Sequence, residues 1–403
     1  MATDTLLREA HDLAPRLIAL RRAIHAEPEL GLDTPLTLAK VRRELADLPL
    51  EWREGPSCTG AVAVLRGGRD GRAVLLRGDM DALPMSEETG LAFASTIPGR
   101  MHACGHDTHT AMLAGAARML AARADTLAGE VRFMFQPGEE GYHGARFMLD
   151  DGLLGGDGHG PLPDAAFALH IMPNAPHGVI GSRAGTLLAS ADTLEITVLG
   201  RGGHASMPHD TRDPVPVACE IVLALQAMVT RRFDAADAVV VTVTQLEAGT
   251  AHNVIPDRAH LRGTIRTLSP GNRAGVREVI RALAQGIAAA HDCAAEVTIT
   301  EGFPPTVNDA RAVAVAEAVA AALPDGKFMT LPAPIMGAED FSYVLEKVPG
   351  MMAFLGVAPE GADWRQCCAI HSSRMTVDEA ALPRGAAFLA GCAVRFLEHG
   401  WGA

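Results

Sequence analysis

The densest group of reactive side chains in the sequence lies between Met101 and His109. This segment reads Met-His-Ala-Cys-Gly-His-Asp-Thr-His, and from residue 102 it holds three imidazoles, a thiol and a carboxylate within eight residues. Zinc, cobalt, nickel and manganese sites favour such mixtures of nitrogen, sulfur and oxygen ligands. The segment therefore predicts a metal centre, and a thiolate at Cys104 can bridge two metal ions where a carboxylate more often serves.

Further candidate ligands follow predicted strands elsewhere in the chain. The strands are expected at 73–77, 130–136 and 165–171, and the polar residues at their ends are Asp79, Asp81, Glu139, Glu140 and His170. In open α/β sheets, sites form outside the carboxyl ends of the strands, so these side chains are expected at one edge of a sheet. His371, from the C-terminal part, can supply another ligand.

Each of these residues taken singly also has a structural interpretation. An isolated histidine such as His170 or His371 is more often a core or surface residue than a ligand. The pair Glu139-Glu140 alone is typical of a solvated turn, and Asp79 and Asp81 suit caps or turns about as well as a site. The dense cluster around Cys104 favours metal binding, and its coincidence with three strand ends strengthens that interpretation.

Two histidines of the cluster are weaker ligand candidates. His109 lies on a helix expected at 108–123, and His102 suits a residue that orients a ligand rather than one that binds the metal.

Two regions of the chain show different orders of secondary structure. Residues 1–186 and 301–403 alternate strands with helices, including helices at 4–26, where Pro15 marks a break or late start, and at 376–398. This alternation predicts an α/β catalytic domain with a mostly parallel sheet.

Residues 187–300 instead predict the order β-α-β-β-α-β, with helices at 213–232 and 270–290. That order is the split, ferredoxin-like unit. We therefore expect a discontinuous catalytic domain, 1–186 and 301–403, interrupted by an inserted α+β domain at 187–300.

The composition excludes some classes of function. The chain has 403 residues, a length that exceeds what one hydrophobic core usually serves, so we expect two domains. Hydrophobic residues make up 48% of the chain, which is enough to form sizeable cores. Its net charge of −13 argues against binding to nucleic acid or an anionic membrane. We see no signal peptide and no run of about 18 apolar residues. Seven scattered cysteines fit reduced thiols, so we expect a cytoplasmic protein.

Several motifs together resemble one known family. They run in family order from residue 21 to residue 373 and are Arg21-Arg-Ala-Ile-His25-Ala-Glu-Pro-Glu29-Leu, Arg77-Gly-Asp79-Met-Asp81-Ala-Leu-Pro84, Met101-His-Ala-Cys104-Gly-His106-Asp107, Gln136-Pro-Gly-Glu139-Glu140-Gly, Ala168-Leu-His170, Gly200-Arg-Gly-Gly-His204-Ala-Ser, His252-Asn253-Val-Ile-Pro256, Gly263-Thr-Ile-Arg266 and Gly337-Ala-Glu-Asp-Phe341. The chain resembles the aminoacylase and carboxypeptidase-type di-metal hydrolases. The cysteine-containing segment is specific to the branch of hippurate hydrolase and the indole-acetyl-amino-acid hydrolases.

The resemblance implies two divalent metal ions per subunit, whether zinc, manganese, nickel or cobalt. It implies that Cys104 bridges them and that the remaining ligands are His106, Glu140, His170 and His371. Glu139 would be the general base, and Asp81 would support the site from behind the ligands.

The resemblance also implies roles for the inserted domain. This domain would carry dimerisation, giving a homodimer or a dimer-based tetramer. His204 would reach the partner subunit's active site and stabilise the oxyanion. Asn253 and Arg266 would hold the substrate carboxylate or the tetrahedral intermediate.

The expected reaction is hydrolysis of the amide bond in N-acyl amino acids such as hippurate-like, N-acetyl or indole-acetyl conjugates. Two alternatives remain, a dipeptidase or carboxypeptidase on the same fold and a non-catalytic metal-binding relative. The stretch His371-Ser-Ser-Arg-Met375 departs from relatives, which more often have Pro and Phe after the serine, and Cys367-Cys368 just before it is unusual. Both departures bear on the substrate pocket rather than on the ligands.

Overall fold

The chain folds into two units, and the second interrupts the first. In the computed structural model, which describes residues 3–156 and 159–402, unit 1 comprises Met1–Leu187, Val307–Ala333 and Asp340–Ala403. Unit 2 comprises Leu188–Thr306 and Pro334–Glu339.

The segment Pro334–Glu339 differs from the sequence-based boundary, which assigned it to the catalytic domain. A bridge between Leu188 and Ile335 explains the difference, together with hydrogen bonds from the Ala189 N–H to the carbonyls of Ile335 (3.1 Å) and Gly337 (2.9 Å). These contacts attach the segment to the start of unit 2.

Unit 1 is built on a mixed sheet whose central strands are parallel. In spatial order its strands are β1 Leu50–Glu54, β2 Ala61–Arg66, β4 Ala128–Gln136, β3 Arg69–Asp79, β5 Ala165–Met172, β16 Gly350–Gly356, β6 Ile180–Ser182 and β15 Phe328–Thr330. Strands β4, β3, β5 and β16 run parallel, whereas β1 and β2 are antiparallel at one edge. The predicted α/β class with a mostly parallel centre is confirmed.

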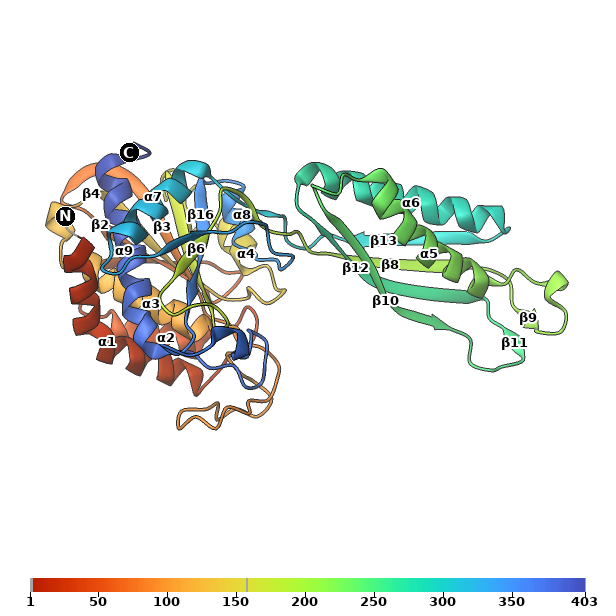
Figure 1. The fold of residues 1–403 in the computed structure, drawn as a ribbon, viewed down its shortest axis with the longest axis horizontal. Helices are drawn as coiled ribbons and strands as arrows, with labels where there is room; N and C mark the ends of the chain where they lie inside the picture. The colour runs from red at the N-terminus through yellow and green to blue at the C-terminus, as the bar shows by residue number, and fades with distance from the viewer. Residues whose placement is uncertain (1–2, 157–158, 403) are drawn as a thin grey trace. The chain divides into compact units, whose positions relative to one another are not determined.

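The helices of unit 1 cover this sheet. They are α1 Thr3–His25, α2 Pro35–Glu44, α3 His106–Ala121, α4 Gly144–Asp150, α7 Ala310–Ala322, α8 Ser342–Leu345 and α9 Leu382–His399, with short 3₁₀ turns at Ala124–Thr126, Trp364–Gln366 and Glu379–Ala381. Figure 1 shows α1, α3 and α9 packed together, and α3 and α9 contact β3 and β5. Their shared core contains Leu17, Leu113 and Phe388, all buried.

Two helix predictions need correction. α1 continues through Pro15, because Leu17, Leu20 and Ile24 beyond it remain packed in the core. The last helix begins at Leu382 rather than at 376, since Asp378 first caps a 3₁₀ turn and Pro383 occupies the first turn of α9. The elements α2, β1 and β2 were not anticipated.

Unit 2 has the predicted β-α-β-β-α-β order. Its main elements are β8 Asp192–Leu199, α5 Pro214–Arg232, β10 Val239–Ala248, β12 Arg258–Thr267, α6 Pro270–Ala290 and β13 Ala294–Thr300. The antiparallel sheet has the order β10-β12-β8-β13, and α5 and α6 pack on it around residues such as Ile196, Ile221 and Ile280 (Figure 1). This arrangement is the ferredoxin-like fold.

Smaller elements complete the chain. They are the strands β7 Gly185–Leu188, β9 Gly203–His204, β11 Val254–Ile255 and β14 Thr306–Asn308, and a 3₁₀ turn at Pro208–Asp210. β9 pairs with β11, which joins two loops of unit 2.

Two helical stretches are long and apolar enough to cross a membrane by length and composition alone. They are Pro214–Arg232 and Glu379–His399. The second is largely buried in the core of unit 1, and the first packs one face on the sheet of unit 2. Core helices pass the same test, so this is weak evidence for a membrane span.

Candidate metal centre

The carboxyl ends of β3, β4 and β5 meet at the predicted edge of the unit 1 sheet. Asp79 ends β3, His170 lies near the end of β5, and the loop after β4 carries Glu139 and Glu140. The structure brings seven of the predicted site residues together there, namely Asp81, Cys104, His106, Glu139, Glu140, His170 and His371.

Cys104 belongs to two separate groups of potential ligands. Its sulfur lies with His106 and His170 in one group and with Glu140 and His371 in the other, and within each group the ligand atoms are at most 4.8 Å apart. A thiolate shared by two such groups is suited to bridging two metal ions. The donors combine sulfur, nitrogen and oxygen, which fits zinc and its first-row neighbours.

The backbone between Cys104 and His106 requires glycine. Gly105 has a φ of 86°, and a Cβ there would lie 2.5 Å from a side-chain carbon of Ile171. Only glycine adopts this conformation at no steric cost. The turn at Gly105 lets α3 begin at His106, two residues after Cys104.

The His170 ring is held with one nitrogen facing the sulfur of Cys104. Its Nδ1–H donates to the Ile171 carbonyl (2.7 Å), so Nε2 is left facing the Cys104 sulfur at 3.3 Å. Burial, together with nearby His109, lowers the pKa of His170 well below its ordinary value. Both effects keep an unprotonated nitrogen directed at the sulfur.

His106 is fully buried and poorly satisfied by its protein neighbours. Its Nε2 lies 3.4 Å from an Asp79 oxygen, and its Nδ1 lies 3.4 Å from an Asp81 oxygen. Among residues 3–156 and 159–402, neither ring nitrogen makes a hydrogen bond of normal geometry. Buried polar atoms are rarely left in this condition, so a metal ion fits the surroundings of His106.

Asp81 holds the loop that carries both glutamates. Its two carboxylate oxygens accept the backbone N–H groups of Glu139 and Glu140, each at 3.0 Å. The Asp81 side chain is buried, and its two hydrogen bonds fix the position of the loop from which the two glutamates project.

His371 enters the cluster from the C-terminal part of unit 1. Its Nε2 lies 3.2 Å from Glu140 Oε1, and hydrogen bonds to Cys104 and Glu140 raise the pKa of His371 to about 10. Burial raises the pKa of Glu140, but the hydrogen bond to His371 outweighs burial, so the pKa of Glu140 is lowered. The residue has a φ of 65°, and its side chain is about half exposed.

Asp79 and His109 support the cluster from behind. Asp79 accepts from His109 Nδ1 at 2.6 Å, and His109 Nε2 accepts the Ile171 N–H at 2.9 Å. Because both nitrogens of His109 are engaged, it is a positioning residue rather than a ligand. Burial raises the pKa of Asp79, but the charges of Arg77, His106 and His109 outweigh this effect and hold the pKa well below its ordinary range.

Sequence reasoning missed the buried network that fixes the start of α3. Asp107 accepts from Arg21 Nε (2.7 Å) and His25 Nδ1 (2.8 Å), and His25 Nε2 lies 3.2 Å from Glu87. The motif from Arg21 to His25 was the one sequence signal for this network, but the motif does not indicate that its side chains contact Asp107. His102 lies beside His25 with its ring buried, and burial lowers its pKa to about 3.

The other three predicted site residues lie in unit 2. His204 on β9 pairs with Val254, and the Asn253 carbonyl accepts the Ala205 N–H at 3.1 Å, so His204 and Asn253 occupy neighbouring loops. The Ser206 N–H donates to His204 Nδ1 at 3.2 Å, which leaves the ring proton on Nε2. Arg266 on β12 is half-buried, and within the described part of the chain it has no ion-pair partner.

Several characterised proteins are similar to this chain over nearly its whole length. It is 39% identical to the N-acetylcysteine deacetylase of Bacillus subtilis, with 95% of this chain and 97% of the relative covered. It is 38% identical to IAA-amino acid hydrolase ILR1-like 2 of Arabidopsis thaliana (95% and 85% covered). It is 37% identical to thermostable carboxypeptidase 2 of Saccharolobus solfataricus (98% of each).

A solved structure and a family profile agree with these relatives. The structure is the YXEP protein of Bacillus subtilis, described as a dinuclear metal binding peptidase from the M20 family. It superposes with a TM-score of 0.83 at 36% identity and covers 96% of this chain and 99% of its own. The profile of peptidase family M20/M25/M40 matches residues 75–395. With this coverage, and with the metal-type cluster in the matched region, the chain belongs to peptidase family M20/M25/M40.

Proposed function

We propose that this protein is a metal-dependent amidohydrolase that cleaves N-acyl amino acids into a carboxylic acid and an amino acid. The observation that carries the proposal is the shared position of Cys104 in two ligand groups, with Glu139 beside them. The deacetylase and the IAA-amino acid hydrolase that resemble the chain are named for such substrates.

The proposal includes two divalent metal ions per subunit. Cys104 would contact both, His106 and His170 would complete one site, and Glu140 and His371 the other. When bound, two such ions polarise a scissile carbonyl and lower the pKa of the attacking water. The ligand atoms suit zinc, manganese, nickel or cobalt.

Glu139 is proposed as the general base. It lies with His106 and Glu140, but it is not in the group that joins Glu140 to Cys104 and His371. A carboxylate outside that ligand group can take the proton of the attacking water and pass it to the leaving amine. Asp81 fixes the backbone of Glu139 while this transfer occurs.

The unit 2 residues are proposed to act on the substrate. His204 carries its proton on Nε2 and is proposed to reach the partner subunit's active site, where it can donate to the negative charge that develops on the carbonyl oxygen. Arg266 offers a guanidinium without an ion-pair partner in the described residues, which suits the substrate carboxylate. Asn253 would add an amide donor from the adjoining loop.

A substrate panel tests the function. Protein loaded with manganese or zinc is incubated with N-acetylcysteine, N-benzoylglycine, an indole-acetyl amino acid and unblocked dipeptides, and the released amino acid is measured. We expect release from the N-acyl substrates and little from the dipeptides. Release mainly from dipeptides would favour the carboxypeptidase alternative, which the Saccharolobus relative supports. No release from any substrate would leave the non-catalytic alternative.

We further propose a cytoplasmic homodimer, or a tetramer of such dimers, assembled through unit 2. β10 is an edge strand of the unit 2 sheet, with exposed apolar residues such as Val240 and Leu246. Unpaired edges of this kind favour association with another chain. Light scattering should therefore give at least twice the chain mass of 42.3 kDa.

A further inference from the structure

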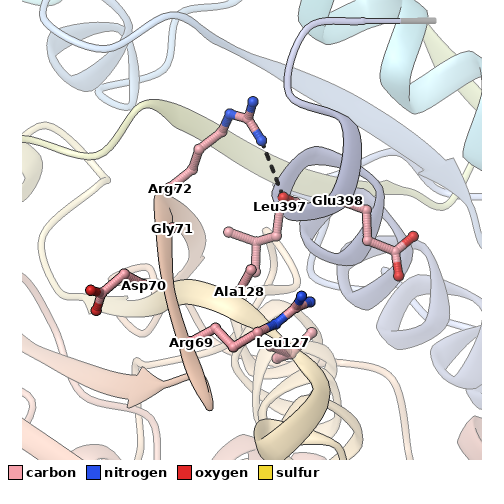
Figure 2. Close-up of a pocket in the computed structure, with 8 residues that line it drawn as sticks. All are labelled: Arg69, Asp70, Gly71, Arg72, Leu127, Ala128, Leu397 and Glu398. Carbon is pink, nitrogen blue, oxygen red and sulfur yellow. Dashed lines mark hydrogen bonds between the residues drawn. The ribbon is translucent and has the colours of Figure 1, made fainter.

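A second polar cavity lies at the opposite end of the unit 1 strands from the metal cluster. It has a volume of about 700 Å³ and includes the start of β3, whereas the metal cluster follows the end of that strand at Asp79. An adjoining hollow is drawn in Figure 2, where the Arg72 guanidinium is already bound to the Leu397 carbonyl at 3.2 Å. The larger cavity differs from this hollow in that buried arginine side chains line it.

Strand register places a group of charged side chains on one face of the sheet. Side chains alternate between the two faces along a strand, and paired residues share a face. The pairing of β1 with β2 and of β2 with β4 therefore puts five lining residues on the same side, namely Glu51, Arg53, Arg66, Glu130 and Arg132.

The charges at the rim of this cavity are paired with one another and exposed to water. Arg66 forms a two-pronged ion pair with Glu51, both bonds at 2.9 Å, and also contacts Glu130 at 3.0 Å. The side chains of Arg66 and Glu51 are 59% and 58% exposed. Two further rim carboxylates, Asp70 and Asp164, are also exposed, so water screens their charge.

Arg132 lies inside the cavity and is fully satisfied. It is buried, it donates to Glu130 through Nε at 2.7 Å, and it donates to the carbonyls of Leu154 and Pro161. Arg132 and Glu130 thus neutralise each other.

Arg53 remains as a buried cation with little to hold it. It is 8% exposed, and its one hydrogen bond to a described residue is a long contact of 3.4 Å to the Leu153 carbonyl. In the described ranges no carboxylate lies within ion-pair distance of it. Burial, and then the charge of Arg132, lower the pKa of the Arg53 guanidinium. Among the residues that the structure describes, the interior of the cavity therefore carries one positive charge in excess.

A buried charge without a partner destabilises a protein, and an oxyanion would compensate it. A guanidinium offers a fixed fork of donors that matches a carboxylate or phosphate group. We propose that this cavity binds a small anionic metabolite through a carboxylate or phosphate group held by Arg53. The site is separate from the catalytic residues and does not depend on the proposed reaction.

Replacing Arg53 by methionine tests the site, because methionine keeps an unbranched chain without the charge. Thermal unfolding of the metal-loaded protein is measured in chloride, in inorganic phosphate and in acetate at equal ionic strength. Saturating anion should raise Tm of the wild type by about 2–4 °C. Phosphate and acetate are separate arms, and the larger shift identifies the preferred group.

The Arg53→Met variant should lose this shift, yet in chloride it should be at least as stable as the wild type. An exposed control, Arg43→Met, should keep the shift. Anion binding at the metal centre is equal in all three proteins, so it cannot produce the difference. Equal shifts in Arg53→Met and the wild type, or no shift in the wild type, would overturn the proposal.

A second variant covers failure of Arg53→Met to fold. Arg53→Lys keeps the charge but not the fork, and calorimetry should show its dissociation constant for the preferred anion raised about tenfold. Unchanged affinity in Arg53→Lys would also contradict the assignment.

Discussion

Glu139 and Glu140 are neighbours in sequence but stand in different surroundings. Both lie near His106, at 4.0 Å for Glu139 and 3.9 Å for Glu140, but only Glu140 also lies in the group with Cys104 and His371. Asp81 binds both of their N–H groups, so the difference arises from the direction of the side chains and not from the backbone. Their substitutions should accordingly have different effects.

Glu139→Gln should lower kcat by about 10³-fold, because the neutral amide cannot accept the proton of the attacking water. Metal analysis should still find two ions per subunit. Glu140→Gln is the matched comparison and should lose metal as well as activity. Wild-type turnover in Glu139→Gln would show that the base lies elsewhere.

Cys104→Ser should weaken both metal sites at once, since its sulfur is shared by the two ligand groups. We expect fewer than one ion per subunit after dialysis, measured by elemental analysis. Cys392→Ser provides the control, because Cys392 is also buried but lies on α9, within the hydrophobic core. Two retained ions in Cys104→Ser would contradict the bridging assignment.

The sequence predicted the local parts of the site better than the distant ones. Cys104 and His106 lie two residues apart, and strand ends indicated where Glu139, Glu140 and His170 would meet. The partners of Asp107 were missed, because Arg21 and His25 lie 86 and 82 residues away from it in the chain. Side-chain pairing over such separations follows from packing, which no local pattern contains.

At the scale of elements, one carboxylate positions the loop after β4. Asp81→Asn would present an amide NH₂ to one of the two N–H groups that Asp81 now accepts. The free energy of unfolding should fall by about 1–3 kcal/mol, and kcat should fall with it. Chemical denaturation and kinetics measure both, with the exposed Asp70→Asn as control. Unchanged kcat would mean that the loop is held by other contacts.

The ion-pair group around Asp192 makes the stability of unit 2 depend on pH. Asp192 is buried and accepts from Arg273 (2.7 Å), Arg277 (3.0 Å) and the Gly302 N–H (2.9 Å). Although burial opposes them, these donors lower the pKa of Asp192 below its ordinary value. A lowered pKa contributes stability that is complete above the unfolded value, about 3.9, and is lost as pH falls through the folded value.

Asp192→Asn should therefore reduce the free energy of unfolding by about 3 kcal/mol at pH 7. Denaturation of the variant and the wild type from pH 7 to pH 2 should show a constant difference above pH about 4 and a narrowing one below it. Glu278→Gln, at an exposed position of α6, should show no such difference. If the difference in free energy of unfolding between wild type and Asp192→Asn were as large at pH 2 as at pH 7, the ionised carboxylate of Asp192 could not be its source.

Periodicity identified most long elements, and the misses have physical reasons. The strands at the centre of the unit 1 sheet are continuous apolar runs, which makes β5 and β16 easy to recognise. The edge strand β1 is a mixture of charged and apolar residues, and its arginine faces a cavity rather than a core. The helix expected at 376 begins later because side-chain capping at Asp378 competes with helical hydrogen bonding.

For the whole molecule, metal should act as a cross-link between distant parts of the chain. The proposed ligands range from Cys104 to His371 and lie on separate segments of unit 1. Removing the ions with a chelator should abolish activity and lower Tm, because a ligand at about 100 times its dissociation constant stabilises by about 2.7 kcal/mol. Both should return when manganese or zinc is added back. An unchanged Tm after verified metal loss would count against metal binding at this cluster.

The two-unit organisation was largely visible in the sequence, since the order β-α-β-β-α-β stands out from the surrounding α/β alternation. The sequence did not indicate that Pro334–Glu339 belongs to unit 2, because this assignment depends on contacts with Leu188 and Ala189, which lie nearly 150 residues earlier in the chain. The assembly state and cellular location stay predictions.

The position of β16 in the sheet has a consequence for protein synthesis. β16 separates β5 from β6, yet it is translated after both strands and after all of β8 to β13. A ribosome therefore completes the main segment of unit 2 at residue 306, while unit 1 still lacks a central strand and α9. Because domains generally fold as units when their residues emerge, the inserted unit should fold first and the catalytic unit last. His371 also emerges after β16, so the nascent chain cannot assemble the complete proposed metal centre until β16 and the segment that follows it have left the ribosome.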